Sequence, residues 1–533
     1  MTLARCLAVS GILLFAAAPA ERLIAQAERA RTPAPEASDP HPADEPKSPS
    51  EKDRKPADEK PAREEKPVVT HHEIRLDGKP FRYTATAGYM PMKDETGKLK
   101  ANIFYVAYVK DGVTNSMRRP ITYTFNGGPG SASVWLHMGA VGPKRVVMAD
   151  DGQPLPPPYR LVDNEWSWLA FTDLVFIDPV TTGYSRAAAG EKPEQFHGVE
   201  EDVQWVGDFI RLWTSRNARW SSPKFLAGES YGTTRAAGLS GYLQERHGMY
   251  LNGIVLISSI LNFETAYFNV GNDLPYATFL PTYTTTAWYY KKLAPDLQAD
   301  FSKAVEESKH FASGDYTLAL MKGAKLSDAE RKTVAQKLAR LTGLSPAFVE
   351  ANDLRVTLSR FTKELLRAEQ RTVGRLDSRF QGIDRDSGGE QPEFDPSMAA
   401  IRGPYGAVVN DYLRTELKYE NDLPYELLTG RVSPWHFGNA QNRYLNVAET
   451  LRGAMSQNPS LHVFVAAGYY DFATPFFAAE YTVYHLQLDP SLRQNVKLEH
   501  YEAGHMMYIH KPSLVKLTSD VAAFYQSAVP PER

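Results

Sequence analysis

The sequence contains one cysteine, no excess of charge of either sign, and no long hydrophobic run beyond its start. Cys6 is the only cysteine among 533 residues, so no disulfide within the chain can support the fold. Lysine and arginine number 60 against 63 aspartate and glutamate, which gives a net charge of -3. This balance argues against a nucleic-acid partner, which usually requires a basic face. After residue 18, no stretch is long and apolar enough to predict a membrane span.

The first 27 residues have the pattern of an export signal. Arg5 precedes an apolar stretch, residues 6–18, that is too short to span a membrane, and small residues suited to an A-x-A cleavage site follow it. We therefore expect residues 1–27 to be a cleaved signal peptide and the mature protein to be periplasmic or secreted. Cys6 would leave with the signal peptide, so the mature chain would contain no thiol.

A second segment without large apolar side chains follows the signal. Residues 28–68 consist mainly of proline, alanine, glutamate, lysine and aspartate. Such a segment cannot bury enough apolar surface to offset the entropy lost on ordering. The composition predicts a disordered linker between the signal peptide and the folded protein.

The rest of the chain opens with strand-like runs and then alternates strands with helices. A hairpin with an Asp-Gly turn is expected at 77–78, and short apolar strands are expected near 174–178, 224–228 and 253–259. Amphipathic helical segments separate these strands, which is typical of a mostly parallel sheet covered on both faces. The alternation stops at residue 262 and resumes near 461. We expect an α/β core over 69–261 and 433–533, interrupted by an inserted helical cap over 262–432.

The pentapeptide GESYG, residues 228–232, is the first candidate site. A G-x-S-x-G sequence between a strand and a helix is the nucleophile-elbow pattern of the α/β-hydrolase fold. In that turn the serine hydroxyl projects from the carboxyl end of the sheet, and the next backbone N–H faces the developing oxyanion. The pattern predicts Ser230 as a nucleophile, with the N–H of Tyr231 as one oxyanion donor.

A serine nucleophile needs a base and an acid that orients the base, and both occur later in the chain. Asp471 ends the apolar run HVFVAAGYYD, and His505 lies in the glycine-marked loop YEAGHMMY. The order serine, acid, histidine is the one expected for α/β-hydrolases. Carboxyl ends of parallel strands meet at one edge of the sheet, so we expect the three side chains to lie together. The glycine-rich segment NGGPG, residues 126–130, follows an earlier strand and is expected to supply the second oxyanion donor.

Several blocks of the sequence resemble the serine carboxypeptidases, which are α/β-hydrolase serine peptidases that remove C-terminal residues from peptides. The similar blocks cover about 120–260 and 460–515, and the chain is similar to a bacterial-type member of that family. In chain order they are NGGPGSAS, NEWSW, LVFIDPVTTGYS, GESYGT, YYDFATP and AGHMMYIHKP.

The resemblance implies a role for each site residue. It implies Ser230 as nucleophile, His505 as base and Asp471 as the residue that orients the base. It further implies an oxyanion hole formed by the N–H groups of Gly128 and Tyr231. Finally, it implies that the terminal carboxylate of a peptide substrate is bound by Asn126, Gly127 and Glu229.

The sequence departs from the family pattern at two positions beside the site. A second glutamate of the family usually lies where this chain has Ala140, and the family's cysteine in GPGC is Ser131 here. A carboxyl group must be protonated to hydrogen-bond a substrate carboxylate, and two close carboxyls hold such a proton to higher pH than one. Lys144 and Arg145 are the cations that could take the place of the missing glutamate.

The expected activity is hydrolysis of peptides with a free C-terminus, without a metal or other cofactor. The acidic stretch 384–395 begins like a calcium loop but does not complete the pattern. Two other functions remain open from the sequence: an esterase or acyltransferase on the same fold, and a binding protein without catalytic activity. The intact set Ser230, Asp471 and His505 argues against the binding protein.

Overall fold

The computed structural model describes residues 66–440 and 442–529. The predicted signal peptide, 1–27, and most of the predicted linker lie outside the described residues. Val68, which the sequence analysis assigned to the linker, is the first residue of strand β1, and its partner in the sheet is Ala87. The folded chain therefore begins slightly earlier than expected. Within the described part of the chain, no helix has both the length and the apolar character needed to cross a membrane.

A ten-stranded sheet forms the centre of the protein, in the order β1-β2-β3-β7-β4-β9-β10-β13-β14, with β8 paired to β3. The first three strands are antiparallel, and the strands from β7 to β14 run parallel. The predicted Asp-Gly hairpin joins β1 to β2, and both turn residues have positive φ. The ten strands are β1 Val68–Leu76, β2 Lys79–Lys93, β3 Leu99–Lys110, β4 Ile121–Phe125, β7 Asp173–Ile177, β8 Arg186–Ala187, β9 Lys224–Ser230, β10 Gly253–Ser259, β13 His462–Gly468 and β14 Val496–Tyr501.

Helices surround this sheet and form the inserted region. Two further two-stranded pairs, β5 Lys144–Val146 with β6 Leu161–Asp163 and β11 Thr372–Val373 with β12 Gln381–Gly382, lie outside the main sheet. The helices are α1 Val134–Leu136, α2 Val199–Arg216, α3 Tyr231–His247, α4 Leu274–Tyr289, α5 Pro295–Gln298, α6 Phe301–Phe311, α7 Thr317–Lys322, α8 Asp328–Thr342, α9 Pro346–Ala351, α10 Leu358–Glu364, α11 Pro396–Thr415, α12 Ala448–Gln457, α13 Phe476–Tyr484 and α14 Lys511–Ala528.

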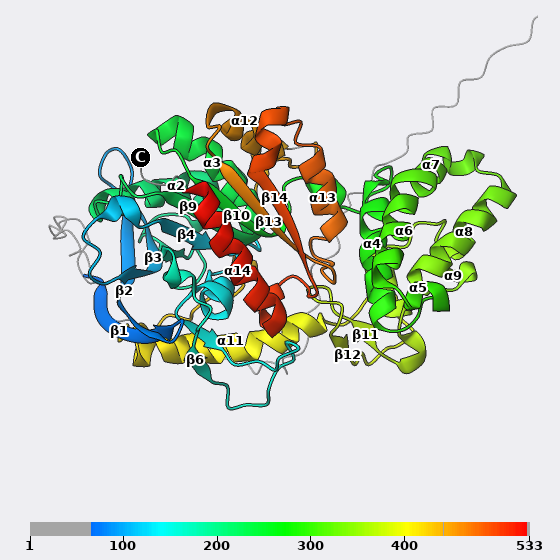
Figure 1. Cartoon of the computed structure of the whole chain (residues 1–533), viewed down its shortest axis with the longest axis horizontal. Coiled ribbons are helices and arrows are strands. Elements are labelled where there is room, and N and C mark those ends of the chain that lie inside the picture. Colours follow the sequence, from blue (N-terminus) through cyan, green and yellow to red (C-terminus); the bar gives the residue numbers. More distant parts are fainter. Residues whose placement is uncertain (1–65, 441, 530–533) are drawn as a thin grey trace, which may run out of the picture. The chain divides into compact units, whose positions relative to one another are not determined.

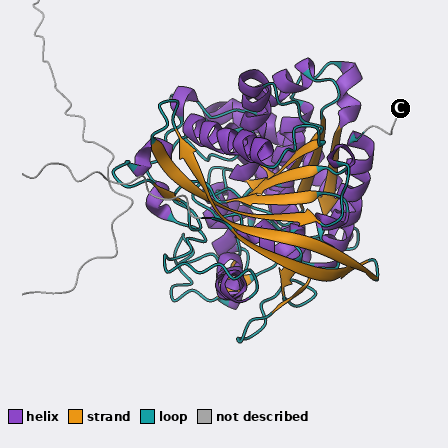
Figure 2. Cartoon of the chain, turned by 90° about the vertical axis from the view of Figure 1, so that its left-hand side faces the viewer, coloured by secondary structure: helices purple, strands orange, loops and turns teal. Residues whose placement is uncertain are grey.

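Each central strand contributes to two hydrophobic cores because successive side chains point to opposite faces. On β7, Leu174 and Phe176 pack into the core under α11 and α14, whereas Val175 and Ile177 pack into the core under α2, α3 and α12. Figure 2 shows the twisted sheet with helices on both faces, and Figure 1 looks onto the face crossed by α14. Burial on both faces explains why these strands are continuous apolar runs in the sequence.

The inserted region falls into two parts that pack differently. Helices α4 to α10 share a hydrophobic core of their own, which includes Phe279, Leu338 and Phe361. Helix α8 begins at the predicted N-cap, Ser327, and is followed by Gly343 in the left-handed conformation. Helix α11 instead packs through Ile401 and Tyr405 into the core of the sheet. Figure 1 shows the two parts as green helices beside the sheet and a long yellow helix along it.

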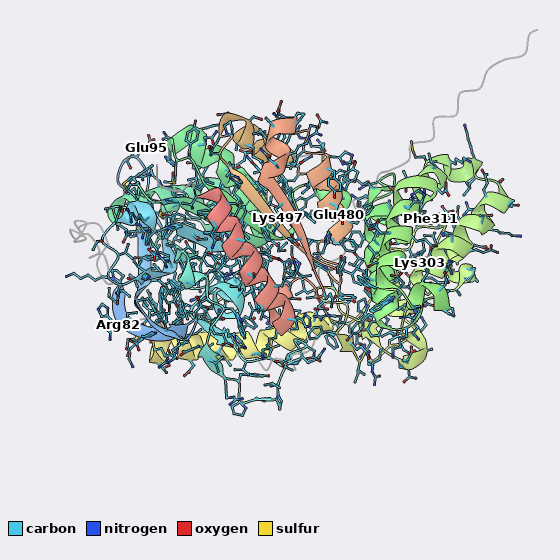
Figure 3. All side chains as sticks on the ribbon, in the orientation of Figure 1. Arg82, Glu95, Lys303, Phe311, Glu480 and Lys497 are labelled. Atoms are coloured by element: carbon cyan, nitrogen blue, oxygen red, sulfur yellow. The ribbon has the colours of Figure 1, made fainter. Side chains whose placement is uncertain are left out.

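Contacts between the first part and the sheet domain include one buried ionic group. Glu480 of α13 is 2% exposed, and its carboxylate lies 2.9 Å from Lys309 Nζ of α6 and 2.9 Å from His500 Nε2 of β14. Figure 3 labels Glu480 on the side of the sheet domain that faces α4 and its neighbours. Removing one member of such a group would leave a buried charge without its partner. The group therefore ties helix α6 to the sheet.

Candidate active site

Ser230 lies at a sharp turn between the buried strand β9 and helix α3. Its backbone has φ 60° and ψ -131°, a combination that is unfavourable for any residue with a side chain. The two flanking glycines make the turn possible. A Cβ on Gly228 would lie 2.2 Å from the carbonyl oxygen of Gly232, and a Cβ on Gly232 would lie 2.8 Å from that of Phe125. The predicted elbow is therefore present, with Ser230 at the carboxyl end of β9.

Asp471 and His505 form a buried pair at the same edge of the sheet. Asp471 follows β13, His505 follows β14, and His505 Nδ1 lies 2.8 Å from Asp471 Oδ2. Asp471 is fully buried, and its other oxygen accepts hydrogen bonds from the backbone N–H groups of Ala473 and Thr474. A carboxylate on Nδ1 favours the tautomer whose Nε2 carries a lone pair. The pair is therefore arranged so that the imidazole can accept a proton at Nε2.

Burial and the neighbouring carboxylates shift the pKa of His505 in opposite directions. Burial lowers the pKa of His505, but the charge of Asp471 and the hydrogen bond to it raise the pKa more, so the result lies above the ordinary value. The carboxylate of Glu229 contributes in the same direction as Asp471. His505 is therefore protonated to a higher pH than an isolated histidine.

The glycine-rich segment after β4 runs against the first turn of α3. A Cβ on Gly127 would lie 2.4 Å from the backbone nitrogen of Tyr231, so only glycine permits this approach. Gly128 has φ 101°, in the region that favours glycine. N–H groups in the first turn of a helix have no intrahelical acceptor and can bind an anion. The two backbone segments expected to form an oxyanion hole are thus adjacent.

A cavity of about 200 Å³ joins most of these groups. Its apolar wall comes from helix α11, through Met398 and Ile401, and from Trp135, Leu376, Leu428 and Met506. The site residues that line it are Asn126, Gly127, Gly128, Glu229, Ser230 and His505. Of the eight residues that the sequence analysis predicted for the site, six line this cavity. Tyr231 adjoins Ser230, and Asp471 lies behind His505.

Glu229 forms the polar floor of the cavity together with Asn126. Glu229 is 3% exposed, and burial raises the pKa of its carboxyl to about 7. Asn126 Oδ1 accepts a hydrogen bond from the N–H of Leu136, and its buried side chain lowers the pKa of Glu229, although its Nδ2 forms no hydrogen bond of good geometry in the described structure. Buried donors without partners are rare and mark places where a ligand can bind. The floor can therefore offer an amide N–H and, below neutral pH, a carboxylic acid O–H.

Tyr508 is a site residue to which the sequence analysis gave no role. Its hydroxyl donates a 2.6 Å hydrogen bond to Glu229 Oε2. Tyr508 lies in the quoted block AGHMMYIHKP, three residues after His505, so the signal was present but its role was not recognised. Ala140 is fully buried on the short π-helix His137–Val141. Ala140 provides no carboxyl group, and Glu229 instead accepts a hydrogen bond from the Tyr508 hydroxyl.

Lys144 and Arg145, the two cations suggested in place of the missing glutamate, do not line the cavity. Lys144 Nζ lies 2.8 Å from Asp163 and 3.1 Å from Glu416. The guanidinium of Arg145 lies over the ring of Trp166, 5.1 Å from its centre. Both cations are engaged elsewhere. The cation that does line the cavity is Arg375, from the turn between β11 and β12.

The turn that carries Arg375 also forms hydrogen bonds with the loops that contain Asp471 and His505. The carbonyl oxygen of Arg375 accepts a 3.1 Å hydrogen bond from the N–H of Phe472, and that of Leu376 accepts a 2.6 Å bond from the N–H of His505. Asp377 Oδ2 accepts from the N–H of Gly504 at 3.0 Å. From the sequence, this turn was expected to belong to the inserted cap, without a role in the site.

The fold and the grouping of Ser230, His505 and Asp471 at one sheet edge define an α/β-hydrolase with a serine-histidine-aspartate arrangement. The chain belongs to the serine carboxypeptidase family, whose model matches residues 76–506. Among solved structures, it is similar in fold to Kex1Δp, a prohormone-processing carboxypeptidase from Saccharomyces cerevisiae. That structure has a TM-score of 0.53 at 17% identity, with 83% of this chain and 91% of the other covered.

Curated relatives are similar over shorter stretches. Serine carboxypeptidase-like 45 of Arabidopsis thaliana is 26% identical over 38% of this chain and 42% of its own length. The pheromone-processing carboxypeptidase KEX1 of Coprinopsis cinerea is 30% identical over 28% of this chain and 24% of its own. These alignments thus span less than half of either partner. They agree with the resemblance noted from the sequence blocks.

Proposed function

We propose that the protein is a serine carboxypeptidase that hydrolyses the C-terminal residue from peptides. The observation that carries the proposal is the cavity itself. It combines a serine at a nucleophile elbow, the ring of a histidine paired with a buried aspartate, and a floor of Asn126 and Glu229 suited to a carboxylate. Membership of the serine carboxypeptidase family supports the same activity.

In the proposed reaction, Ser230 Oγ attacks the carbonyl carbon of the last peptide bond. His505 Nε2 takes the hydroxyl proton, and Asp471 stabilises the imidazolium that forms. The N–H groups of Gly128 and Tyr231 stabilise the oxyanion. The C–N bond then breaks, His505 gives its proton to the departing amine, and an acyl-enzyme remains on Ser230. Water activated by His505 hydrolyses the ester and regenerates the serine.

Selection of the C-terminus is assigned to the floor of the cavity. Asn126 Nδ2 donates to one carboxylate oxygen of the substrate, the protonated Glu229 donates to it as well, and the N–H of Gly127 lies beside them. The pKa of about 7 for Glu229 keeps this carboxyl largely protonated in mildly acidic solution. The small volume, about 200 Å³, suits a single residue beyond the scissile bond.

We further propose that the protein acts outside the cytoplasm, in the periplasm or after secretion. The pattern of residues 1–27 supports this, and those residues lie outside the described structure. The expected partners are peptides with a free C-terminus.

A mixed peptide library tests the function directly. Incubation at several pH values followed by mass spectrometry should show stepwise loss of C-terminal residues, and amidated copies of the same peptides should resist. Hydrolysis of simple esters without cleavage of free peptides would favour an esterase, and transfer of the acyl group to an added amine or alcohol would favour an acyltransferase. A fluorophosphonate probe that fails to label the protein would favour a binding protein without catalysis.

A further inference from the structure

Arg375 is a charged residue of the cavity wall that the proposed reaction does not use. It lines the active-site cavity and also a neighbouring cavity of about 730 Å³, so it lies at the junction of the two. Among the residues that line the smaller cavity it is the sole lysine or arginine. Arginine keeps its positive charge at every working pH.

The position of Arg375 beside the triad is fixed by its backbone. Its N–H donates a 3.0 Å hydrogen bond to Asp395 Oδ1, and its carbonyl oxygen accepts from Phe472, the residue after Asp471. The next carbonyl, of Leu376, accepts from the N–H of His505. The loops that contain Asp471 and His505 therefore both form hydrogen bonds with the turn and fix its position. The charge of Arg375 accordingly acts on His505, whose pKa it lowers.

The guanidinium of Arg375 forms no hydrogen bond or ion pair with the residues that the structure describes, whereas the charged groups around it are engaged. Asp395 uses its oxygens to accept the N–H groups of Arg375, Leu376 and Ser397. Across the larger cavity, Arg360 lies 3.2 Å from Glu390. A guanidinium with five donors and no partner beside a substrate cavity is suited to a carboxylate.

The geometry of the cavity indicates which carboxylate this is. Asn126 and Glu229, at the floor, are 1% and 3% exposed, whereas Arg375 is exposed. Because Arg375 lines both cavities, a peptide whose terminal carboxylate rests on the floor and whose chain continues into the larger cavity passes Arg375. The residues that pass Arg375 therefore belong to the amino side of the scissile bond. We propose that Arg375 binds the side-chain carboxylate of an aspartate or glutamate there, so that the enzyme prefers peptides with an acidic residue next to the one it removes.

This inference rests on the proposed carboxypeptidase function, and its test uses matched peptides. Two peptides that end in Glu-Ala and Gln-Ala differ only in one side-chain charge. For the wild-type protein at pH 6, we expect kcat/KM to favour Glu-Ala by roughly 1.5- to 5-fold, the range of an exposed charge pair. Arg375→Gln should abolish the preference, and Arg375→Glu should reverse it toward a peptide that ends in Lys-Ala.

Arg371→Gln is the matched control because it removes the same charge four residues earlier, where the side chain lines neither cavity. It should keep the wild-type preference. The proposal is overturned if the wild-type protein treats both peptides alike, or if Arg375→Gln keeps the preference. It is also overturned if Arg375→Gln weakens all free peptides equally and spares amidated ones, since Arg375 would then bind the terminal carboxylate.

A binding measurement separates this proposal from the proposed function. Calorimetry with Ser230→Ala measures the affinity of the two peptides without turnover. If the wild-type protein cleaves no peptide, the carboxypeptidase function fails, and a difference in affinity that Arg375→Gln removes still supports the role of Arg375. If peptides are cleaved but both bind with equal affinity, the role of Arg375 fails alone.

Discussion

The hydroxyl of Tyr508 donates a 2.6 Å hydrogen bond to Glu229 Oε2 at the floor of the candidate active site. A hydrogen bond to the ionised form of a carboxyl favours that form, so it lowers the pKa. Burial acts more strongly in the other direction, and the pKa of Glu229 is about 7. Tyr508 therefore moderates a pKa that burial alone would raise further.

Replacing Tyr508 by phenylalanine should extend peptide binding to higher pH. Glu229 must be protonated to bind a carboxylate, so KM for a free peptide should rise as the pH passes about 7 in the wild-type protein. Loss of the Tyr508 hydrogen bond raises the pKa of Glu229, and the rise in KM should move to higher pH. Tyr405→Phe is the control, because Tyr405 also lies close by but makes no hydrogen bond with Glu229 in the described structure. A KM profile for Tyr508→Phe that coincides with the wild type would contradict this account.

Replacing Glu229 by glutamine should change two pH profiles. A glutamine cannot ionise, so KM for free peptides should stay low above pH 7. The charge of Glu229 also raises the pKa of His505, so its removal should move the acid limb of kcat/KM for an ester substrate to lower pH. An ester without a free carboxylate reports on His505 alone. If Glu229→Gln binds free peptides no better than the wild type at neutral pH, Glu229 does not bind the terminal carboxylate.

The close approach of Gly127 to helix α3 predicts a loss of activity in Gly127→Ala. A Cβ there would lie 2.4 Å from the backbone nitrogen of Tyr231, so the two oxyanion segments must move apart. Loss of one oxyanion donor typically lowers kcat by about 10²- to 10³-fold, and we expect a decrease of that order. Steady-state kinetics with an ester substrate would measure it. A variant within twofold of the wild-type kcat would show that the two segments do not act as an oxyanion hole.

The elbow glycines predict a contrast in stability. Gly232→Ala introduces a Cβ 2.8 Å from the carbonyl oxygen of Phe125, and we expect it to lower the free energy of unfolding by about 1–3 kcal/mol. Gly453 lies in helix α12 with no atom within 4 Å of an added Cβ, so Gly453→Ala should instead raise it by about 0.5–1 kcal/mol. Urea unfolding of both variants measures the difference. Equal stabilities would contradict the packing described for the elbow.

The sequence predicted the parts of the site that follow from local patterns. A glycine-flanked serine between a strand and a helix predicted the sharp turn at Ser230, and apolar strands before Asp471 and His505 predicted that both side chains lie at the carboxyl ends of strands. These strands are parallel, so their carboxyl ends meet at one edge. The roles of Arg375 and Leu376 could not be predicted in this way. Their contacts with Phe472 and His505 join residues about a hundred positions apart, and no local period records such a pairing.

The inserted region shows the same limit. Its helices were expected from their caps and amphipathic spacing, and α8 begins and ends as Ser327 and Gly343 predict. The sequence does not show which of these helices pack against one another and which pack on the sheet, because tertiary contacts decide this. Helix α11 packs on the sheet, and this position lets Met398 and Ile401 line the candidate site. The hydrogen bond between Tyr508 and Glu229 could not be predicted either, because the two residues are 279 positions apart in the sequence.

The turnover of Ser230→Ala tests the central claim most directly. The variant should unfold at the same denaturant concentration as the wild type, lose fluorophosphonate labelling, and show a kcat on peptides lower by several orders of magnitude, about a million-fold in a comparable triad. Retention of even a tenth of the wild-type rate would contradict the assignment of Ser230 as the nucleophile.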